Sequence, residues 1–326
     1  MRLDVEGFQQ VERLDLGGAC AFLAIHAAPS GRSFGGVRVG TYASDDDALD
    51  DACRLARAMT RKVLLAGIPA GGAKTVIRLP AGGWPPAARA AGLARLGEHI
   101  ERLGGLYHCG ADLGFTDADE TALRATTRHV AARSIGIWTA RSVLLALRAV
   151  LPEPRSVAIQ GLGVVGRGVA EDLLGAGCRV VAADLDEAAG AGLRGLERVA
   201  PSALIEADCE VLSPCATGGV IDTEVAGRLR SGVVCGGANN PLADDAAADR
   251  LHARGIVYVP DVISNAGAVI QGASEALGQH AQIEPRLAAV ADTVRAVLDR
   301  SRREDRSPHH VARDMADALL VLAQER

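Results

Sequence analysis

Lysine occurs at only two positions of the 326-residue sequence, Lys62 and Lys74. The other basic residues are 33 arginines, because lysine and arginine together number 35 (35 − 2 = 33). Lysine differs from arginine in that burial can lower its pKa towards neutrality, so that it can lose a proton. The pattern therefore indicates a pocket in which one amine binds an anion and the other performs proton chemistry. Two ordinary surface lysines are the alternative interpretation.

Both lysines flank a turn that is rich in glycine and proline. A helix is predicted to begin after Ser44, a good N-cap that three aspartates follow, and to end near Lys62. Strands are predicted over 20–26 and 36–42 before it and over 75–77 after it, so Lys74 is expected where a loop enters a strand. Asp112 follows a short predicted strand over 105–109; its alternative role is that of a turn or helix-cap residue.

The C-terminal half contains the pattern of a dinucleotide site. Gly161, Gly163 and Gly166 lie between a predicted strand over 156–160 and a predicted helix over 167–175, and Asp184 ends the next strand. Such glycines allow a tight turn and a close approach to a pyrophosphate. Asp184 would bind the ribose hydroxyls, and the acidic residues after it would repel a 2′-phosphate, so NAD is expected rather than NADP. A glycine-rich turn that binds no nucleotide is the alternative.

Three further strands, predicted over 210–212, 232–235 and 255–259, each end in a small polar loop. In an open parallel sheet, ligands bind at the carboxyl ends of the strands. Asn239, Asn240 and Asn265 lie in these loops and are candidates for binding the nicotinamide amide or a substrate carbonyl. As ordinary turn asparagines they would need no such role.

The composition excludes several other classes of function. Aromatic residues make up only 3%, and the net charge is −5 without a basic run, so no nucleic-acid partner is expected. No apolar run reaches the ~18 residues of a membrane helix, and the N-terminus lacks a signal-peptide core, so we expect no membrane partner and a cytoplasmic location. The seven scattered cysteines form no Cys-x-x-Cys pair, so neither a disulfide framework nor a metal site is expected.

These motifs together resemble those of the Glu/Leu/Phe/Val dehydrogenases, nearest the leucine, phenylalanine and tryptophan branch. The matching stretches are 34–39, 59–62, 71–76, 111–114, 157–163, 214–216, 238–240 and 260–267. The resemblance runs in order over nearly the whole chain. It implies the reversible conversion of an L-amino acid, NAD⁺ and water into a 2-oxo acid, ammonium and NADH.

The resemblance also implies the fold and the domains. We expect an α/β protein of two domains with the active site in the cleft between them. An N-terminal α/β domain for substrate binding and oligomerisation would cover 1–134, completed by a C-terminal helix over 305–326. A Rossmann NAD-binding domain would cover 135–304, with a hinge over 130–137. A homo-oligomer, a dimer or larger, is expected.

Residue roles follow from the resemblance position by position. Lys62 would bind the substrate carboxylate, Lys74 would be the base that activates water, and Asp112 would shuttle protons to and from the amine. The other residues implied in substrate binding are Phe34, Gly35, Gly110, Asn240 and Val269. Those implied in cofactor binding are Thr139, Gly161, Gly163, Val164, Val165, Gly166, Asp184, Leu185, Cys215, Ala216, Ala238, Asn239, Asn240 and Asn265.

Two departures from the family pattern keep other functions open. Ala111 stands where an acidic residue often precedes the aspartate, and the hinge before Thr139 is shorter than usual. The main hypothesis is an NAD-dependent dehydrogenase of apolar L-amino acids. The alternatives are a reductase of a related carbonyl or imine in a biosynthetic pathway and a non-catalytic NAD-binding protein.

Overall fold

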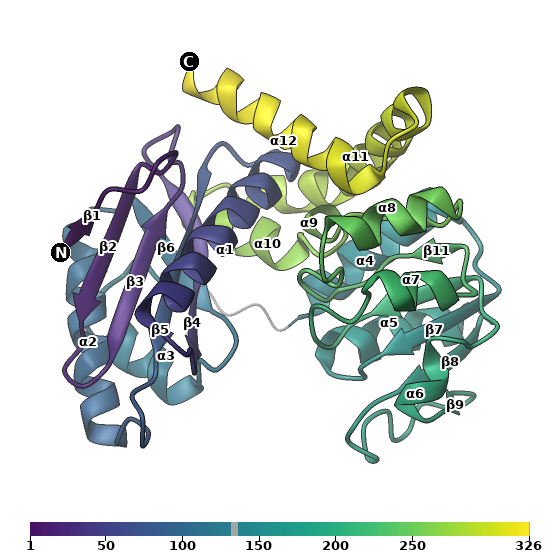
Figure 1. The fold of residues 1–326 in the computed structure, drawn as a ribbon, viewed down its shortest axis with the longest axis horizontal. Coiled ribbons are helices and arrows are strands. Elements are labelled where there is room, and N and C mark those ends of the chain that lie inside the picture. Colours follow the sequence, from purple (N-terminus) through teal and green to yellow (C-terminus); the bar gives the residue numbers. More distant parts are fainter. Residues whose placement is uncertain (132–135, 326) are drawn as a thin grey trace. The chain divides into compact units, whose positions relative to one another are not determined.

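The computed structural model describes residues 1–131 and 136–325. Its chain forms two compact units (Figure 1). The first consists of Met1–Arg133, Gly272–His280 and Ala316–Arg326, and the second of Ser134–Gln271 and Ala281–Met315. The predicted hinge over 130–137 and the predicted domain boundary after residue 134 fall largely on 132–135, outside the described residues. The domain boundaries given above stay a prediction.

The first unit is built on a six-stranded mixed sheet with the order β1-β2-β3-β5-β4-β6. The strands are β1 (Arg2–Leu3), β2 (Gln10–Asp15), β3 (Cys20–Ile25), β4 (Ser33–Gly40), β5 (Gly71–Arg78) and β6 (Tyr107–Ala111). The helices that complete it are α1 (Asp45–Leu65), α2 (Pro86–Arg102) and α3 (Asp117–Arg124). Strand β4 runs parallel to β5 on one side and to β6 on the other.

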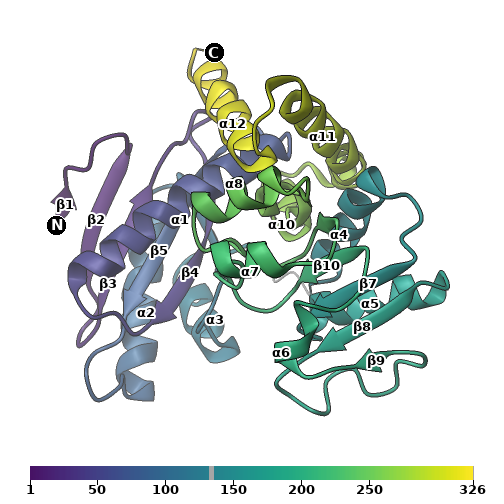
Figure 2. The ribbon, with the colours of Figure 1, turned by 45° about the vertical axis from the view of Figure 1, so that its right-hand side comes forward.

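Residue alternation along β3 explains why helices cover both faces of this sheet. Ala21, Leu23 and Ile25 point into a core that includes Leu93 and Leu96 of α2. Phe22 and Ala24 point into a second core with the apolar stripe of α1. Successive side chains of a strand face opposite sides, so an almost wholly apolar strand requires cover on both. Figure 2 shows α1 lying along strands β3 and β5.

Helix α1 begins as predicted and ends one turn beyond Lys62. The Ser44 side chain accepts a hydrogen bond from the Asp47 backbone, and Asp47 accepts one from the Ser44 backbone, which forms a capping box. Strand β5 begins earlier than expected, so Lys74 is its fourth residue and not a residue at a loop–strand junction. Gly71 and Gly72 extend the strand because their backbones pair with β4 at Ser33 and Phe34.

The second unit contains a parallel six-stranded sheet with the order β12-β11-β10-β7-β8-β9. Its strands are β7 (Ser156–Gln160), β8 (Arg179–Ala183), β9 (Glu197–Arg198), β10 (Val211–Pro214), β11 (Val233–Val234) and β12 (Val257–Tyr258). Its first helices are α4 (Ile137–Val150), α5 (Val164–Gly175), α6 (Pro201–Leu204), α7 (Thr223–Arg228), α8 (Asp245–Ala253) and α9 (Asp261–Ser264). The order, with β7 central and β8 and β10 beside it, is that of a Rossmann sheet.

The last helices are α10 (Gly267–Ala276), a 3₁₀ turn over His280–Gln282, α11 (Ile283–Glu304) and α12 (Pro308–Gln324). Arg61 of α1 donates to Asp317 of α12 at 3.1 Å, and both residues belong to the first unit. Among the described residues, no helix is long and apolar enough to cross a membrane. Helix α5 starts at Val164, earlier than the predicted Arg167, so the glycine motif itself forms the first turn.

Candidate active site

Lys74 and Asp112 form a close ion pair in the first unit. The Lys74 Nζ lies 2.5 Å from Asp112 Oδ2, and the two side chains are 7% and 17% exposed. Lys74 is on β5, and Asp112 directly follows β6. Strand β4 lies between these two strands, and a Cβ at its Gly36 would lie 2.8 Å from the Asp112 Cβ and 3.1 Å from the Lys74 Nζ. Asp112 is therefore not a simple turn residue, and Lys74 is not a surface lysine.

The charges of this pair are set by burial and by a third group. Burial lowers the pKa of Lys74, against the attraction of Asp112, which raises it. Burial alone would raise the pKa of Asp112, but Lys74 and Arg38 outweigh it and hold that pKa well below its ordinary value. The pair can thus present an ionised carboxylate beside an amine that loses its proton more readily than a free lysine.

Lys62 lies in the last turn of α1 and is 7% exposed, so it too is buried. This end of α1 packs directly on β5 at Gly72. The Gly72 backbone N–H donates to Thr60 Oγ1 at 3.0 Å. A Cβ at residue 72 would lie 2.0 Å from the Thr60 nitrogen, so only glycine allows this approach. The sequence therefore places its two lysines on a helix and a strand that are in direct contact.

Phe34, Gly35 and Gly110 lie on the neighbouring strands β4 and β6. Phe34 is buried, and its ring centroid lies 5.2 Å from that of His108. Burial lowers the pKa of His108 to about 4, so this imidazole is neutral at physiological pH. A Cβ at Gly35 would lie 1.7 Å from the Ala73 carbonyl oxygen, which explains the glycine next to Phe34. The aromatic neighbour of Phe34 is thus uncharged, and the two rings together fit an apolar group.

The glycine motif of the second unit forms a turn that a pyrophosphate could approach. Gly161 has a φ of +89°, which L side chains rarely adopt. A Cβ at Gly166 would lie 1.9 Å from the Gly161 carbonyl oxygen. A Cβ at Gly163 would meet no atom within 4 Å, so the space outside this residue is open. The N-terminal turn of α5, with the exposed Val164 and the half-buried Val165, follows directly.

Asp184 directly follows β8, which ends at Ala183, and two backbone amides fix its carboxylate. Leu162 N–H donates to it at 2.6 Å and Asp186 N–H at 2.9 Å. These bonds lower its pKa, so the carboxylate is ionised and suited to ribose hydroxyls. Leu185 beside it is 91% exposed. Arg198, which the sequence reasoning did not consider, lies close by and donates to the Asp186 carbonyl oxygen at 3.1 Å.

The polar loops after β11 and β12 meet at Asn265. Its side-chain amide donates to Asn239 Oδ1 at 2.9 Å and to the Ala238 carbonyl at 3.2 Å. Its own Oδ1 is buried and has no hydrogen-bond partner among the residues that the structure describes, which suits the amide N–H of a nicotinamide. The residues present therefore fit NAD. Other expected cofactor residues are close: a Cβ at Gly161 would touch Ala216, which follows Cys215, and a Cβ at Gly237 would touch Val165 and Thr139.

The residues expected in catalysis and substrate binding are divided between the two units. Lys62, Lys74, Asp112, Phe34, Gly35 and Gly110 belong to the first unit. Asn240 and Val269 belong to the second, with the cofactor residues. Asn240 has a φ of +48°, and its N–H donates to Asp261 at 2.9 Å. The assembly of both sets into one site, and the roles of the individual residues, stay a prediction.

Sequence reasoning missed Arg38, although it lies within a stretch that carries the family resemblance. Its Nε donates to Asp112 Oδ2 at 3.1 Å. Strand alternation would have found it, because residues two apart on a strand share a face. Gly36 lies beside Asp112. Arg38 is two residues further along the same strand, so its side chain is on the face of Gly36 and reaches the same carboxylate.

Comparison with known proteins identifies the family. Residues 11–102 match the model of the Glu/Leu/Phe/Val dehydrogenase dimerisation domain, and residues 183–304 match that of the Glutamate/Leucine/Phenylalanine/Valine dehydrogenases. The chain belongs to the Glu/Leu/Phe/Val dehydrogenase family. It is 33% identical to a leucine dehydrogenase of Thermoactinomyces intermedius over 94% of this chain and 89% of that protein. It is 34% identical to a phenylalanine dehydrogenase of Caldalkalibacillus thermarum over 86% and 80%.

Solved structures of the Glu/Leu/Phe/Val dehydrogenase family share the fold. The L-tryptophan dehydrogenase from Nostoc punctiforme matches 98% of this chain with 97% of its own, with a TM-score of 0.86 and 26% identity. The predicted α/β fold of two domains, the class of enzyme and NAD as cofactor are thereby confirmed.

Proposed function

We propose that this amino acid dehydrogenase catalyses the reversible, NAD-dependent oxidative deamination of an apolar L-amino acid. The observation that carries the proposal is the buried pair of Lys74 and Asp112, joined at 2.5 Å beside a glycine. Such a pair offers a base and an acid within reach of one small substrate. The relatives named above act on leucine and phenylalanine, which are both apolar.

Each lysine then has a separate role. Lys62 supplies a positive charge to the substrate carboxylate. Once the α-carbon has lost its hydride, it is the carbon of an imine, and Lys74 in its neutral form takes a proton from the water that attacks this carbon. Asp112 moves protons to and from the amine, which leaves as ammonia. NAD, when bound, accepts the hydride of the α-carbon. Asp184, Asn265 and the turn from Gly161 to Gly166 would hold it.

The substrate side chain is proposed to lie beside Phe34. Phe34 is apolar and the neighbouring His108 is neutral, so neither ring offers an opposite charge to a charged side chain. Gly110 and Val269 would line the rest of the pocket. We therefore expect branched or aromatic 2-oxo acids to be accepted and 2-oxoglutarate to be rejected.

One assay separates this function from the alternatives. NADH loss is followed with a panel of 2-oxo acids, each with and without ammonium. Turnover that requires ammonium supports the dehydrogenase, and turnover without ammonium indicates a carbonyl reductase. NADH binding without turnover on any substrate indicates a non-catalytic protein, and 2-oxoglutarate as the best substrate would contradict the apolar pocket.

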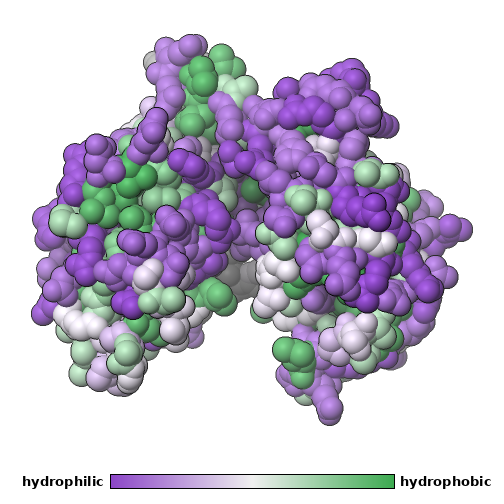
Figure 3. All heavy atoms as spheres, viewed as in Figure 1, coloured by the Kyte–Doolittle hydropathy of each residue, from purple (hydrophilic) through white to green (hydrophobic). Residues whose placement is uncertain are grey.

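We further propose a cytoplasmic homo-oligomer, a dimer or larger. The matched N-terminal family model describes a dimerisation domain. The last turns of α12 leave Leu319, Val321 and Leu322 exposed, and Figure 3 shows hydrophobic residues gathered at that end of the chain. Seven free cysteines fit a reducing compartment. The mass in solution, measured by light scattering, tests the assembly, and a monomer at micromolar concentration would contradict it.

A further inference from the structure

Arg38 bridges the reacting pair to a second carboxylate outside it. Its Nε lies 3.1 Å from Asp112 Oδ2, the same oxygen that contacts Lys74. Its Nη1 lies 3.2 Å from Asp51 Oδ2. The Arg38 side chain is 18% exposed and that of Asp51 is 14% exposed, so both are largely removed from water. Charged groups this buried interact more strongly than surface ion pairs.

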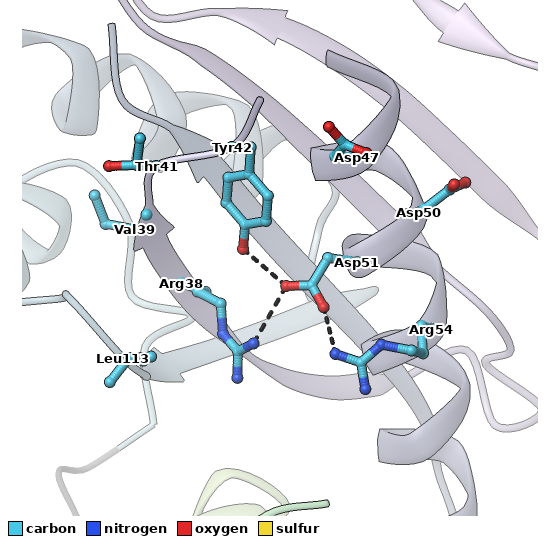
Figure 4. Close-up of a pocket in the computed structure, with 10 residues that line it drawn as sticks. Arg38, Val39, Thr41, Tyr42, Asp47, Asp50, Asp51, Arg54 and Leu113 are labelled. Carbon is cyan, nitrogen blue, oxygen red and sulfur yellow. Dashed lines mark hydrogen bonds and ion pairs between the residues drawn. The ribbon is translucent and has the colours of Figure 1, made fainter. Parts of the chain in front are cut away.

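Asp51 is itself held from two sides. Tyr42 donates its hydroxyl to Asp51 Oδ2 at 2.7 Å, and Arg54 Nη2 donates to Oδ1 at 2.5 Å. Together with Arg38, these residues converge on the Asp51 carboxylate: Arg38 from β4, Tyr42 from the turn after it and Arg54 from α1 (Figure 4). They line a cavity of about 610 Å³. The outer end of Arg38 therefore has a fixed anchor.

The charges explain why an arginine is useful at this point. When Lys74 is protonated, Asp112 has two positive neighbours, Lys74 and Arg38. When Lys74 gives up its proton, Arg38 remains as the positive neighbour of the buried carboxylate, because a guanidinium does not deprotonate in proteins. Without Arg38, the neutral form of Lys74 would leave an unpaired charge in a buried place, which is costly.

We propose that Arg38 is a positioning residue: anchored on Asp51, it orients Asp112 towards Lys74 and neutralises Asp112 whenever Lys74 is unprotonated. This inference rests on the proposed function and extends it to a residue outside the lysine–aspartate pair. The role needs both ends of the guanidinium, because one nitrogen contacts Asp112 and another contacts Asp51. A lysine at this position could keep the charge but not the fork.

The same geometry predicts how Arg38 affects Lys74. Its positive charge lowers the pKa of Lys74, in the same direction as burial and against Asp112. Other ionisable groups on the packed elements include Asp51, Arg54 and Lys62 of α1, Tyr42 after β4, and Tyr107 of β6. Of these, Asp51 acts on Lys74 in the opposite direction to Arg38. Loss of Arg38 should therefore move the titration of Lys74 to higher pH.

The two-lysine sequence permits a test that does not depend on turnover. Labelling with [ε-¹³C]lysine gives two side-chain signals, which Lys62→Arg and Lys74→Arg assign, and their shifts against pH report each titration. For Arg38→Gln we expect the Lys74 midpoint to rise by about one pH unit or more. The pH profile of deamination should move the same way, with kcat falling more than tenfold at pH 8 and KM changing less.

The matched control is Arg78→Gln. Arg78 lies on β5, the strand of Lys74, and like Arg38 it pairs with an aspartate of α1, here Asp45 at 3.3 Å. It should leave the Lys74 midpoint in place. Arg38→Lys should keep the midpoint near that of the wild type and still lose kcat. Asp51→Asn keeps the charge of Arg38, so we expect reduced kcat with a small change in midpoint.

An unchanged Lys74 midpoint in a folded Arg38→Gln would overturn the inference, as would full kcat in that variant. If Arg38→Gln does not fold, wild-type kcat in both Arg38→Lys and Asp51→Asn would overturn it. Failure of the proposed function would look different: the wild type would then turn over no amino acid, while the two lysine titrations would remain measurable.

Discussion

Gly36 lies directly against Asp112 and leaves room for the Lys74 ammonium. A Cβ at residue 36 would come within 2.8 Å of the Asp112 Cβ and 3.1 Å of Lys74 Nζ. The first distance is shorter than real Cβ atoms show, and the second is tighter than most of their contacts, so a side chain here must displace the pair. The glycine is thus required by space and not by backbone conformation, since its φ is not in the left-handed region.

Gly36→Ala should therefore lower kcat without unfolding the protein. A displacement of about 1 Å at a reacting group can cost on the order of 10²-fold in rate. We expect a loss of about 10–100-fold, measured as NADH formation from the preferred amino acid, with a nearly unchanged melting temperature. Gly175→Ala is the control, because a Cβ there meets no atom within 4 Å. Equal kcat in the two variants would contradict the geometry.

The two lysines should respond differently to replacement by arginine. Lys74→Arg keeps the charge but cannot lose a proton, so kcat should fall by about 10²–10⁴-fold, the usual size of a general-base contribution. Lys62→Arg keeps the positive charge that binds the substrate carboxylate, so it should mainly raise KM. Steady-state kinetics of both variants decides the point. A larger loss of kcat in Lys62→Arg would mean that the roles are exchanged.

The pH dependence of deamination should follow the titration of Lys74. Because burial lowers the pKa of Lys74, the active, neutral amine forms below the ordinary lysine value of about 10.4. The rate should rise with pH through that midpoint. Asp112→Asn removes the charge that favours protonated Lys74, so the midpoint should move to lower pH, opposite to the change expected for Arg38→Gln.

Lysine-selective NMR titration of Asp112→Asn measures this directly, even where its turnover is too slow to follow. A midpoint that moves to higher pH, or does not move, would show that Asp112 does not act on Lys74 through its charge.

The cofactor preference should depend on Asp184. Its ionised carboxylate is fixed by two backbone amides, so a 2′-phosphate would meet a negative charge that cannot turn away. We expect NADH to be used at least about tenfold more efficiently than NADPH, which corresponds to about 1.4 kcal/mol. Asp184→Ser should bring the kcat/KM for NADPH closer to that for NADH. The nearby positive charge of Arg198 should help, because it attracts the 2′-phosphate. Equal efficiency of the two cofactors in the wild type would contradict the assignment.

Local signals in the sequence were sufficient for elements with clear caps or glycine motifs. The Ser44 cap, the strand over 156–160 and the turn at Gly161 were all predicted, because each depends on neighbours within a few residues. The start of β5 at Gly71 was not predicted, because two consecutive glycines usually mark the end of a strand or a turn. Here a Cβ at Gly71 would lie 1.8 Å from the Ala27 carbonyl oxygen, so the packing against distant residues requires glycine.

Contacts across the sheets were harder to predict than the elements themselves. Arg198 comes near Asp186 because β9 pairs with β8, where Arg198 lies opposite Ala182. Strand β9 has only two residues, and no periodic pattern marks it. The contact of Arg38 was more predictable than that of Arg198. The alternation of side chains along β4 places Arg38 on the same face as Gly36 and hence beside Asp112.

The first unit begins earliest along the chain and is completed last. Its sheet lies within the first 111 residues, yet Gly272–His280 and Ala316–Arg326 also belong to it. The ribosome makes the chain from the N-terminus, and domains usually fold in that order. Here the segment that contains Asp317 reaches Arg61 only after the whole second unit has been synthesised. The unit that contains the Lys74–Asp112 pair therefore stays incomplete until the nucleotide-binding residues have been translated.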